Sequence, residues 1–418
     1  MGSRRSVGLV LGPAMSWSGR LLPHSAIVIV AAAMSACGSR PEPVANIRDS
    51  AGVALVDSRT PVDGVAPRYQ IDSAPVVDIG GGPDPHGEFT PGIEAVRLRG
   101  GQIVIAEHHE LRWFDRRGRW LRSVGRQGSG PGEFRQINLL AQFGDSVLVY
   151  DFALRRVSVF DSAGNYGRGT TIVDADTLGE TFPVGVLGDG RLLLASYQEP
   201  APVNGLRRDS VLLRIGSPAG AIQAVIGRFP YLDQVIEARA GGISMSRSVF
   251  GLMAYWGTWD SLVLVAPNER FSFDWYGADG RLQRSVRRQW TPVPVTTAAV
   301  TAQIEEWLSE FPAGMEKRKA QARASWAAAP RREVKPPYGR VLVSAAGEVW
   351  VQEYGEPGQR SRPAVYSVFD RSGPWLGQVT VAAGVELRMV GTDEILAVWR
   401  DQDEVTHVRV YPLRQSGR

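Results

Sequence analysis

The chain has 418 residues, among them 47 glycines, 27 prolines and one cysteine, Cys37. Its formal net charge is +4, but residues 1–37 carry three arginines and no acidic residue, so the rest of the chain has a net charge of +1. This near-neutral balance gives no electrostatic basis for binding nucleic acid. The glycine and proline content favours a β-protein with many turns.

The N-terminal segment has the pattern of a secretory signal. Arg20 precedes the short apolar run Ala26–Ala33, which leads into Met34-Ser35-Ala36-Cys37. A basic residue, an apolar run too short to span a membrane and small residues at a cleavage site are typical of such signals. The ending Met-Ser-Ala-Cys resembles a bacterial lipobox. We therefore predict a lipoprotein signal over residues 1–37, with an ordinary signal peptide as the alternative.

Lipid on Cys37 would anchor the protein to a membrane of the cell envelope without a spanning helix. The residue after the cysteine is Gly38 and not aspartate, which favours the outer membrane by resemblance to sorted lipoproteins. Residues 38–48 are expected to form a flexible tether. Either Met1 or Met15 could be the start of translation.

The stretch Gly100–Phe134 is the first complete repeat unit. Its apolar runs Ile103–Ala106, Leu111–Phe114 and Trp120–Val124 are separated by turn residues, and a glycine-rich corner follows. Short apolar runs bounded by turns predict an antiparallel meander. One meander cannot bury both of its faces, so further copies are expected.

Similar units follow along the whole chain. The second copy begins at Gly144, and its Phe160 lies 46 residues after Phe114. Further apolar strand pairs are predicted near residues 190–215, 261–290, 347–369 and 394–411. Six units of about 40 residues predict an all-β fold, a six-bladed β-propeller, over residues 49–418.

The segment before the first unit contains two apolar patches, Val53–Val56 and Tyr69–Ile79. It has the end of a repeat unit without its beginning. We therefore expect the N-terminal segment to complete the last blade, so that no open edge separates the first and last blades.

A helical insertion is predicted at residues 296–330, between the fourth and fifth blades. Thr296 or Thr297 can cap the first helix, and Pro312 interrupts the pattern. One apolar stripe recurs at helical spacing, formed by Val300, Ile304, Trp307, Leu308 and Phe311. We expect two short helices that cover one face of the propeller.

The corner Gly130-Pro131-Gly132-Glu133-Phe134, followed by Asp151, Arg156 and Phe160, resembles the repeat of NHL-type six-bladed propellers. The resemblance is good over residues 79–164. Together with the signal, it implies a six-bladed propeller lipoprotein of the kind found in bacteria.

Each of the first two units has an acidic residue at the end of one strand and an arginine at the start of the next. These are Glu107 and Arg112 in the first unit and Asp151 and Arg156 in the second. We expect them to pair with each other or with turn amides. They would then stabilise the blade and not bind a ligand.

A metal-dependent enzyme is the main alternative function. Enzymes on this scaffold place a metal and His, Asp or Glu side chains around the central channel, which makes Glu107, His108 and His109 the candidate catalytic residues. Such a site draws histidines from several blades, and most units here supply none. No Gly-x-Ser-x-Gly elbow, phosphate-binding loop or dinucleotide fingerprint occurs. We therefore expect no cofactor, with a divalent metal as the alternative.

Large aromatic residues gather in the fourth unit and the predicted insertion. The candidate ligand-binding residues are Tyr255, Trp256, Trp259 and Trp307. They would form a pocket or docking surface if they shared the face of the insertion, and Arg228–Met245 is expected as a long loop at the border of that face. Packing between blades is the alternative.

These patterns favour an envelope-anchored binding or scaffold module without catalysis. The face with the insertion would engage a protein, a peptide or a small ligand. A metal-dependent envelope lyase or hydrolase is the alternative, and a purely structural lipoprotein is a third possibility.

Overall fold

The computed structural model describes residues 45–62, 68–172, 181–197, 203–239, 242–309, 311–312, 314–355 and 362–415. The chain divides into two units, Met1–Glu42 and Pro43–Arg418, and all described residues belong to the second. The predicted signal over residues 1–37, including Cys37, lies outside the described residues.

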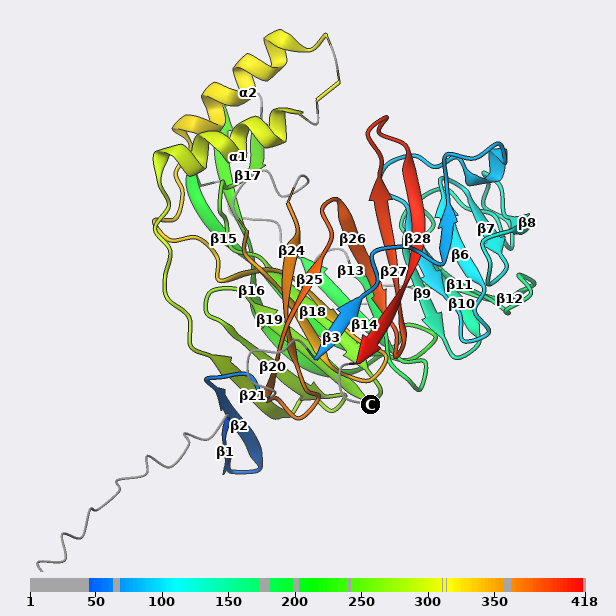
Figure 1. The fold of residues 1–418 in the computed structure, drawn as a ribbon, viewed down its shortest axis with the longest axis horizontal. Helices are drawn as coiled ribbons and strands as arrows, with labels where there is room; N and C mark the ends of the chain where they lie inside the picture. Colours follow the sequence, from blue (N-terminus) through cyan, green and yellow to red (C-terminus); the bar gives the residue numbers. More distant parts are fainter. Residues whose placement is uncertain are drawn as a thin grey trace, which may run out of the picture. The chain divides into compact units, whose positions relative to one another are not determined.

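The described residues form six sheets, and apart from the N-terminal strands β1 to β4 the strands of each sheet follow the chain order (Figure 1). The first blade contains η1 (Pro85–Gly87), β5 (Glu94–Arg97), β6 (Ile103–Glu107), β7 (Glu110–Phe114) and β8 (Trp120–Val124). The second contains β9 (Ile137–Phe143), β10 (Ser146–Asp151), β11 (Arg156–Phe160) and β12 (Tyr166–Thr171). The third contains β13 (Thr181–Val186), β14 (Leu192–Tyr197), β15 (Gly205–Gly216), β16 (Ile222–Arg239) and β17 (Gly242–Arg247).

The remaining blades have the same antiparallel order. The fourth contains β18 (Ala254–Trp259), β19 (Leu262–Pro267), β20 (Ser272–Gly277) and β21 (Leu282–Arg288). The fifth contains β22 (Tyr338–Val343), β23 (Val349–Glu353), β24 (Ala364–Phe369) and β25 (Trp375–Val381). The sixth contains β26 (Val385–Val390), β27 (Glu394–Arg400) and β28 (Thr406–Gln415).

The six sheets close into a ring, as predicted. The innermost strands β5, β9, β13, β18, β22 and β26 each contact the next, and β26 contacts β5. The core lies between neighbouring blades: Trp113 of the first blade and Phe160 of the second are both buried, with ring centroids 6.1 Å apart. The fold is a six-bladed β-propeller.

The N-terminal segment completes the last blade through β3 (Tyr69–Ile71) and β4 (Val77–Ile79), which both pair antiparallel with β28. This confirms the predicted closure for the second apolar patch. The assignment of the first patch to the last blade is wrong. It lies in a hairpin of β1 (Ala45–Ser50) and β2 (Val53–Ser58), and β2 pairs in parallel with β21 of the fourth blade.

The hairpin joins the fourth blade because Val56 is buried there. Its side chain packs beside Val286 and against Gly373 of the fifth blade. An apolar alternation predicts a strand but does not specify which sheet edge it joins. Residues 45–48, which we expected in the tether, belong to β1.

The insertion consists of α1 (Thr297–Ser309) and α2 (Glu316–Ala328), between β21 and β22 as predicted. Thr296 Oγ1 accepts a hydrogen bond from the amide of Ala299 and caps α1. The buried part of the apolar stripe, Val300, Ile304 and Leu308, packs with Val249 and Phe250. Helix α2 has no buried residue.

Candidate functional site

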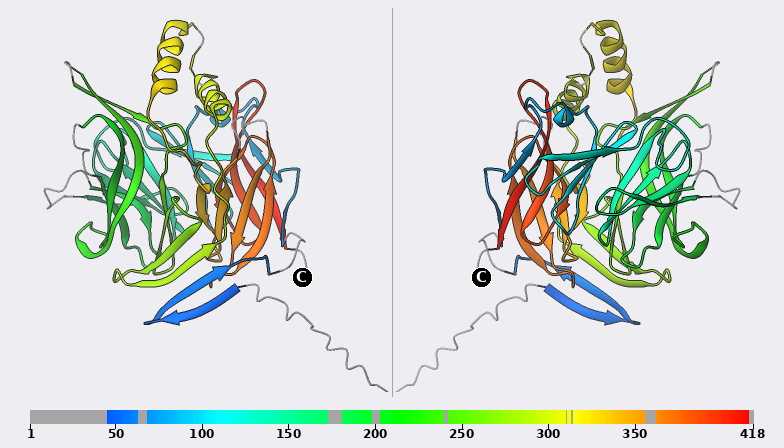
Figure 2. Two further views of the ribbon diagram at one scale, coloured as in Figure 1. Left: turned by 90° about the vertical axis from the view of Figure 1, so that its left-hand side faces the viewer. Right: turned by 90° about the vertical axis from the view of Figure 1, so that its right-hand side faces the viewer.

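The position of each connection follows from the strand order. Each sheet runs in chain order from its innermost to its outermost strand, so the turn between its second and third strands lies at the same end as the connection to the next blade. The His108–His109 turn, the β16–β17 hairpin and the insertion therefore share one end of the ring. We call this end the insertion face. In Figure 2, both helices project from this end.

The candidate catalytic residues of the first blade do not converge on a common point. Glu107 is buried, and its carboxylate accepts hydrogen bonds from the amide and the hydroxyl of Thr90. His108 has a φ of 53°, a side chain that is 62% exposed, and Nδ1 at 2.8 Å from the Glu107 carboxylate. The ring of His109 is 6.4 Å from that of His108. Among the described residues, no group of three or more His, Cys, Asp or Glu side chains could hold a metal ion.

The acidic residues and arginines of the repeat do not pair with each other. Asp151 accepts hydrogen bonds from the amides of Arg135, Gln136 and Leu154, in the corner and the next turn. Arg112 and Arg156 donate to backbone carbonyls of the segment before the innermost strand, at His86, Glu88, Ser129 and Glu133. The turn-amide alternative is therefore the correct one for Asp151, and Glu107 acts in the same way on Thr90.

Two of the predicted ligand-binding aromatics pack between blades. Burial raises the pKa of the Tyr255 hydroxyl to about 12, and the Tyr255 ring lies 6.4 Å from that of Tyr338. Trp259 donates from Nε1 to the carbonyl of Ala345 at 3.2 Å. Its indole also covers Gly347, where a Cβ would lie 2.5 Å from the ring. For these two residues, inter-blade packing explains their contacts.

Trp256 belongs to a half-buried aromatic cluster between the third and fourth blades. Its ring centroid lies 5.5 Å from that of Tyr231, which is 4.7 Å from Tyr197. Tyr197 in turn stacks on Phe182 at 5.0 Å. The cluster joins strands that are far apart in sequence, so the spacing of residues could not predict it.

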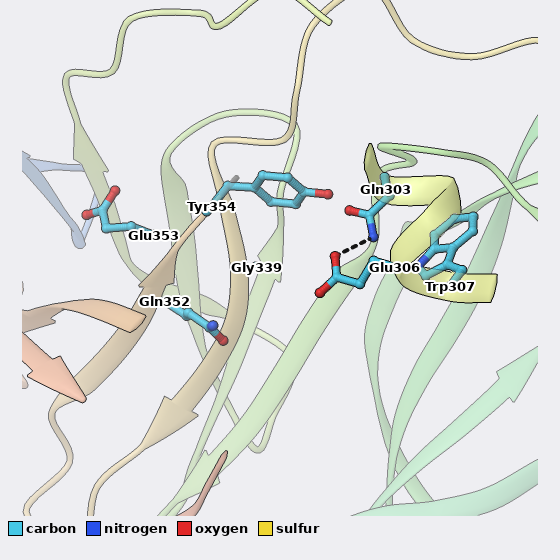
Figure 3. Close-up of a pocket in the computed structure, with 8 residues that line it drawn as sticks. Gln303, Glu306, Trp307, Gly339, Gln352, Glu353 and Tyr354 are labelled. Atoms are coloured by element: carbon cyan, nitrogen blue, oxygen red, sulfur yellow. Dashed lines mark hydrogen bonds between the residues drawn. The ribbon is translucent and has the colours of Figure 1, made fainter. Parts of the chain in front are cut away.

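Of the four predicted ligand-binding residues, Trp307 lines two cavities on the insertion face. One is a small polar cavity of about 190 Å³ between α1 and the fifth blade (Figure 3). Gln303 donates from Nε2 to Glu306 at 3.1 Å, and Tyr354 extends toward α1 from the opposite wall. The remaining lining residues are Gly339, Gln352, Glu353 and Gly355.

The second cavity is larger, about 650 Å³, and lies between β17 and the insertion. We call it the aromatic groove. Its lining residues are Ser246, Arg247, Trp307, Phe311, Pro312, Met315, Arg318 and Trp326. Among the described residues, two arginines and no acidic residue line this groove, beside three large aromatic side chains.

The aromatic wall of the groove also joins the two helices. Trp326 of α2 meets Trp307 edge-to-face at 5.3 Å and Phe311 at 6.2 Å. Arg323 of α2 donates to both carboxylate oxygens of Glu305 on α1, at 2.6 and 2.9 Å. These hydrogen bonds hold the pKa of the Glu305 carboxyl below its usual value. The wall is thus built mainly by aromatic contacts and one surface ion pair.

β17 and the arginines of the groove were not predicted from the sequence. Arg228–Met245 was expected as a loop, but it forms most of the hairpin of β16 and β17. Pro230 obscured the strand signal, and it lies next to the irregularity where β16 pairs with Arg208 and Ser210. Arg247 and Arg318 follow no motif, and only the fold brings them to one groove.

The comparisons with known proteins concern the fold. The family DUF5128, described as a 6-bladed beta-propeller, matches residues 89–178. No curated protein matches the chain. None of the helices in the described part of the chain is long and apolar enough to cross a membrane.

Several solved structures resemble the chain at low identity. A Bacteroides fragilis protein whose name assigns it to the exported proteins is 10% identical, with a TM-score of 0.47 over 87% of this chain and 99% of that one. A DUF4221 member from Bacteroides vulgatus is 9% identical, with a TM-score of 0.40 over 84% and 99%. The Pan2 WD40 domain of Neurospora crassa is 11% identical, with a TM-score of 0.36 over 82% and 97%. At these identities and scores they carry no argument about ligand or activity.

Proposed function

We propose that this protein is a binding module of the cell envelope that holds an acidic polypeptide segment of a partner protein in the aromatic groove. The observation that carries the proposal is the groove itself. It combines three large aromatic side chains with two arginines, Arg247 and Arg318, on the face that also carries the insertion.

A polypeptide fits the groove better than a small ligand does. The groove lies between a strand and two helices, and Met315 adds a flexible apolar side chain to its aromatic wall. Aromatic and arginine side chains are the residues that most often dominate the free energy of protein association. A partner segment with one or two large apolar side chains would bury them against Trp307, Phe311 and Trp326.

The charge of α2 and of the segment that follows it favours an acidic partner. Residues 316–335 contain seven basic and two acidic residues, a net charge of +5. They include all three lysines of the sequence, Lys317, Lys319 and Lys335. Because residues 38–418 together carry only +1, the rest of the propeller is net negative. A positive patch on a negative molecule attracts an acidic segment to this face and disfavours basic partners.

The proposal also includes a location at the cell envelope and an assignment to the NHL-type propellers. Lipid on Cys37 would hold the propeller at the envelope, with the insertion face open to partners there. The NHL-type repeat is the propeller subclass that the corner residues 130–134 favour. Replacing Cys37 with alanine would release the protein from the membrane fraction and abolish acyl labelling if this anchor is used.

The groove can be tested with a fluorescein-labelled peptide that contains glutamate, leucine and one tryptophan. We expect the purified protein to bind it, as followed by fluorescence anisotropy. The Trp326→Ala variant should bind at least about tenfold more weakly, because truncation of a large aromatic side chain that a partner covers costs about 1.4 kcal/mol or more. Trp120→Ala in β8 is the matched control, since Trp120 is a half-exposed tryptophan outside the groove.

A second variant removes the whole insertion. Deletion of residues 297–329 should leave a folded propeller that no longer binds the acidic peptide. The wild-type protein should also prefer the acidic peptide to one in which lysine replaces glutamate. Equal binding of the acidic peptide by the deletion variant and the wild type would rule out the groove as the site.

A further inference from the structure

We infer that the acidic segment binds as an additional β-strand on the free edge of β17. This inference rests on the proposed function, because the same segment would also fill the aromatic groove. It adds a backbone conformation and a side-chain alternation to what the groove alone predicts.

The edge of β17 is the first support. The third sheet has the strand order β13-β14-β15-β16-β17, so β17 is its last strand. Its residues 242–247 pair with residues 239–234 of β16 on one side. On the other side no backbone hydrogen bond to β17 occurs among the described residues. Every second residue of such a strand directs its N–H and C=O outward, where another strand can pair.

The side chains of β17 are the second support. Proteins usually protect an exposed edge with charged residues, proline or a bulge. The strand sequence Gly-Ile-Ser-Met-Ser-Arg has no proline and only a terminal charge, and its pairing with β16 has no register shift. Ile243 and Met245 are 51% and 54% exposed. An unprotected edge with two exposed apolar side chains is the pattern of a strand that binds another strand.

Continuity with the groove is the third support. β17 ends at Ser246 and Arg247, and both residues line the aromatic groove. In Figure 1, β17 lies directly below α1, which supplies Trp307. A strand added along β17 therefore leads into the groove without a change of direction. One segment could therefore pair with the free edge of β17 and place a side chain in the aromatic groove.

The geometry specifies the kind of segment that fits. In a strand, successive side chains point to opposite faces. Apolar side chains at alternate positions would cover Ile243 and Met245, and the end of the segment would place a large apolar side chain in the groove. Glutamate or aspartate near that end would face Arg247 and Arg318. The partner is thus an extended segment with alternating apolar residues and an acidic end.

N-methylated peptides test this mode of binding. The probe is a short fluorescein-labelled peptide that alternates leucine and glutamate and ends in tryptophan and glutamate. Two versions carry N-methyl groups, one on its odd-numbered and one on its even-numbered residues. N-methylation removes the donors of a β-ladder and leaves the side chains in place. An added strand pairs through every second residue, so one version should lose at least about tenfold in affinity and the other should bind nearly as well as the parent.

The outcomes separate the two proposals. If both versions bind like the parent peptide while Trp326→Ala still weakens binding, strand addition is wrong and the groove is retained. The same holds if both versions lose affinity equally, because strand pairing requires a difference between the two sets. If the parent peptide does not bind the wild-type protein, both proposals fail. As a check on the fold, far-UV circular dichroism of each protein variant should match that of the wild type.

Discussion

Arg208 of β15 is a buried cation without a hydrogen bond in the described part of the structure. Its side chain is 11% exposed, and none of its three guanidinium nitrogens has a hydrogen-bond partner. The carboxylate of Glu269 is 3.9 Å away, too far for a hydrogen bond. Asp233 lies opposite Arg208 in the pairing of β15 with β16. Its carboxylate accepts hydrogen bonds from Arg332 and from the amide of Leu252. Burial accordingly lowers the pKa of the Arg208 guanidinium.

We predict that Arg208→Met leaves the free energy of unfolding unchanged or raises it by about 1–3 kcal/mol. The reason is that an apolar side chain of similar length removes the desolvation cost of a mostly buried charge that makes no hydrogen bond. Urea denaturation followed by tryptophan fluorescence measures the change. A loss of stability of the same size would mean that the 3.9 Å pairing with Glu269 outweighs this cost.

Arg332→Met is the matched control and should have the opposite sign. Asp233 is fully buried, and Arg332 holds its carboxylate with two hydrogen bonds, at 2.8 and 3.1 Å. Among the described residues, removing this partner leaves the buried carboxylate with a hydrogen bond from the Leu252 amide and with the more distant charge of Arg208. Because the Arg332 side chain is partly exposed, we expect a loss of about 2 kcal/mol, below the usual cost of breaking a fully buried pair.

At the scale of single elements, the attachment of α2 to α1 is expected to depend on pH. It has no buried residue, and the Glu305–Arg323 pair joins it to α1. The folded-state pKa of Glu305 lies below the ordinary value of 4.5, so the pair contributes stability above pH 4.5. That contribution is lost as the pH falls through the lowered pKa.

We therefore expect α2 to open more often below pH 4.5 while α1 stays ordered. Hydrogen exchange, corrected for the intrinsic effect of pH, should show a greater loss of protection in α2 than in α1 on acidification. In Glu305→Gln, α2 should have the lower protection already at neutral pH and should lose no more on acidification. An equal response of the variant and the wild type would show that the pair does not hold α2.

The elements that sequence predicts well are those with strong local patterns. The corner of residues 130–134 and the paired strands around Asp151 specify a blade because turn chemistry and apolar runs agree there. The helix stripe was also predictable, since Val300, Ile304 and Leu308 recur at helical spacing. In contrast, β17 alternates over only two apolar residues, Ile243 and Met245, and has no buried residue, so its pairing with β16 is its main strand signal. The groove depends on β17, so its full set of residues could not be found before the fold was known.

At the scale of the whole molecule, both ends of the propeller meet in the last blade. β28 near the C-terminus pairs with β3 and β4 near the N-terminus, and Ile79 of β4 is buried with Val398 and Val408. Without β3 and β4, the sixth sheet would present β28 as an unpaired edge beside the first blade. The ring is therefore expected to unfold as one cooperative unit.

Ile79→Ala tests the contribution of this closure. Removing a buried isoleucine side chain should lower the free energy of unfolding by about 2–5 kcal/mol, because the lost burial and the cavity both cost stability. Ile47→Ala in β1 is the matched control, since Ile47 is 55% exposed and its loss should change stability by about 0.5 kcal/mol or less. Urea denaturation should show a single transition at a lower midpoint for Ile79→Ala. A separate early transition would mean instead that the sixth blade opens independently, and that pairing between the two ends does not make the ring cooperative.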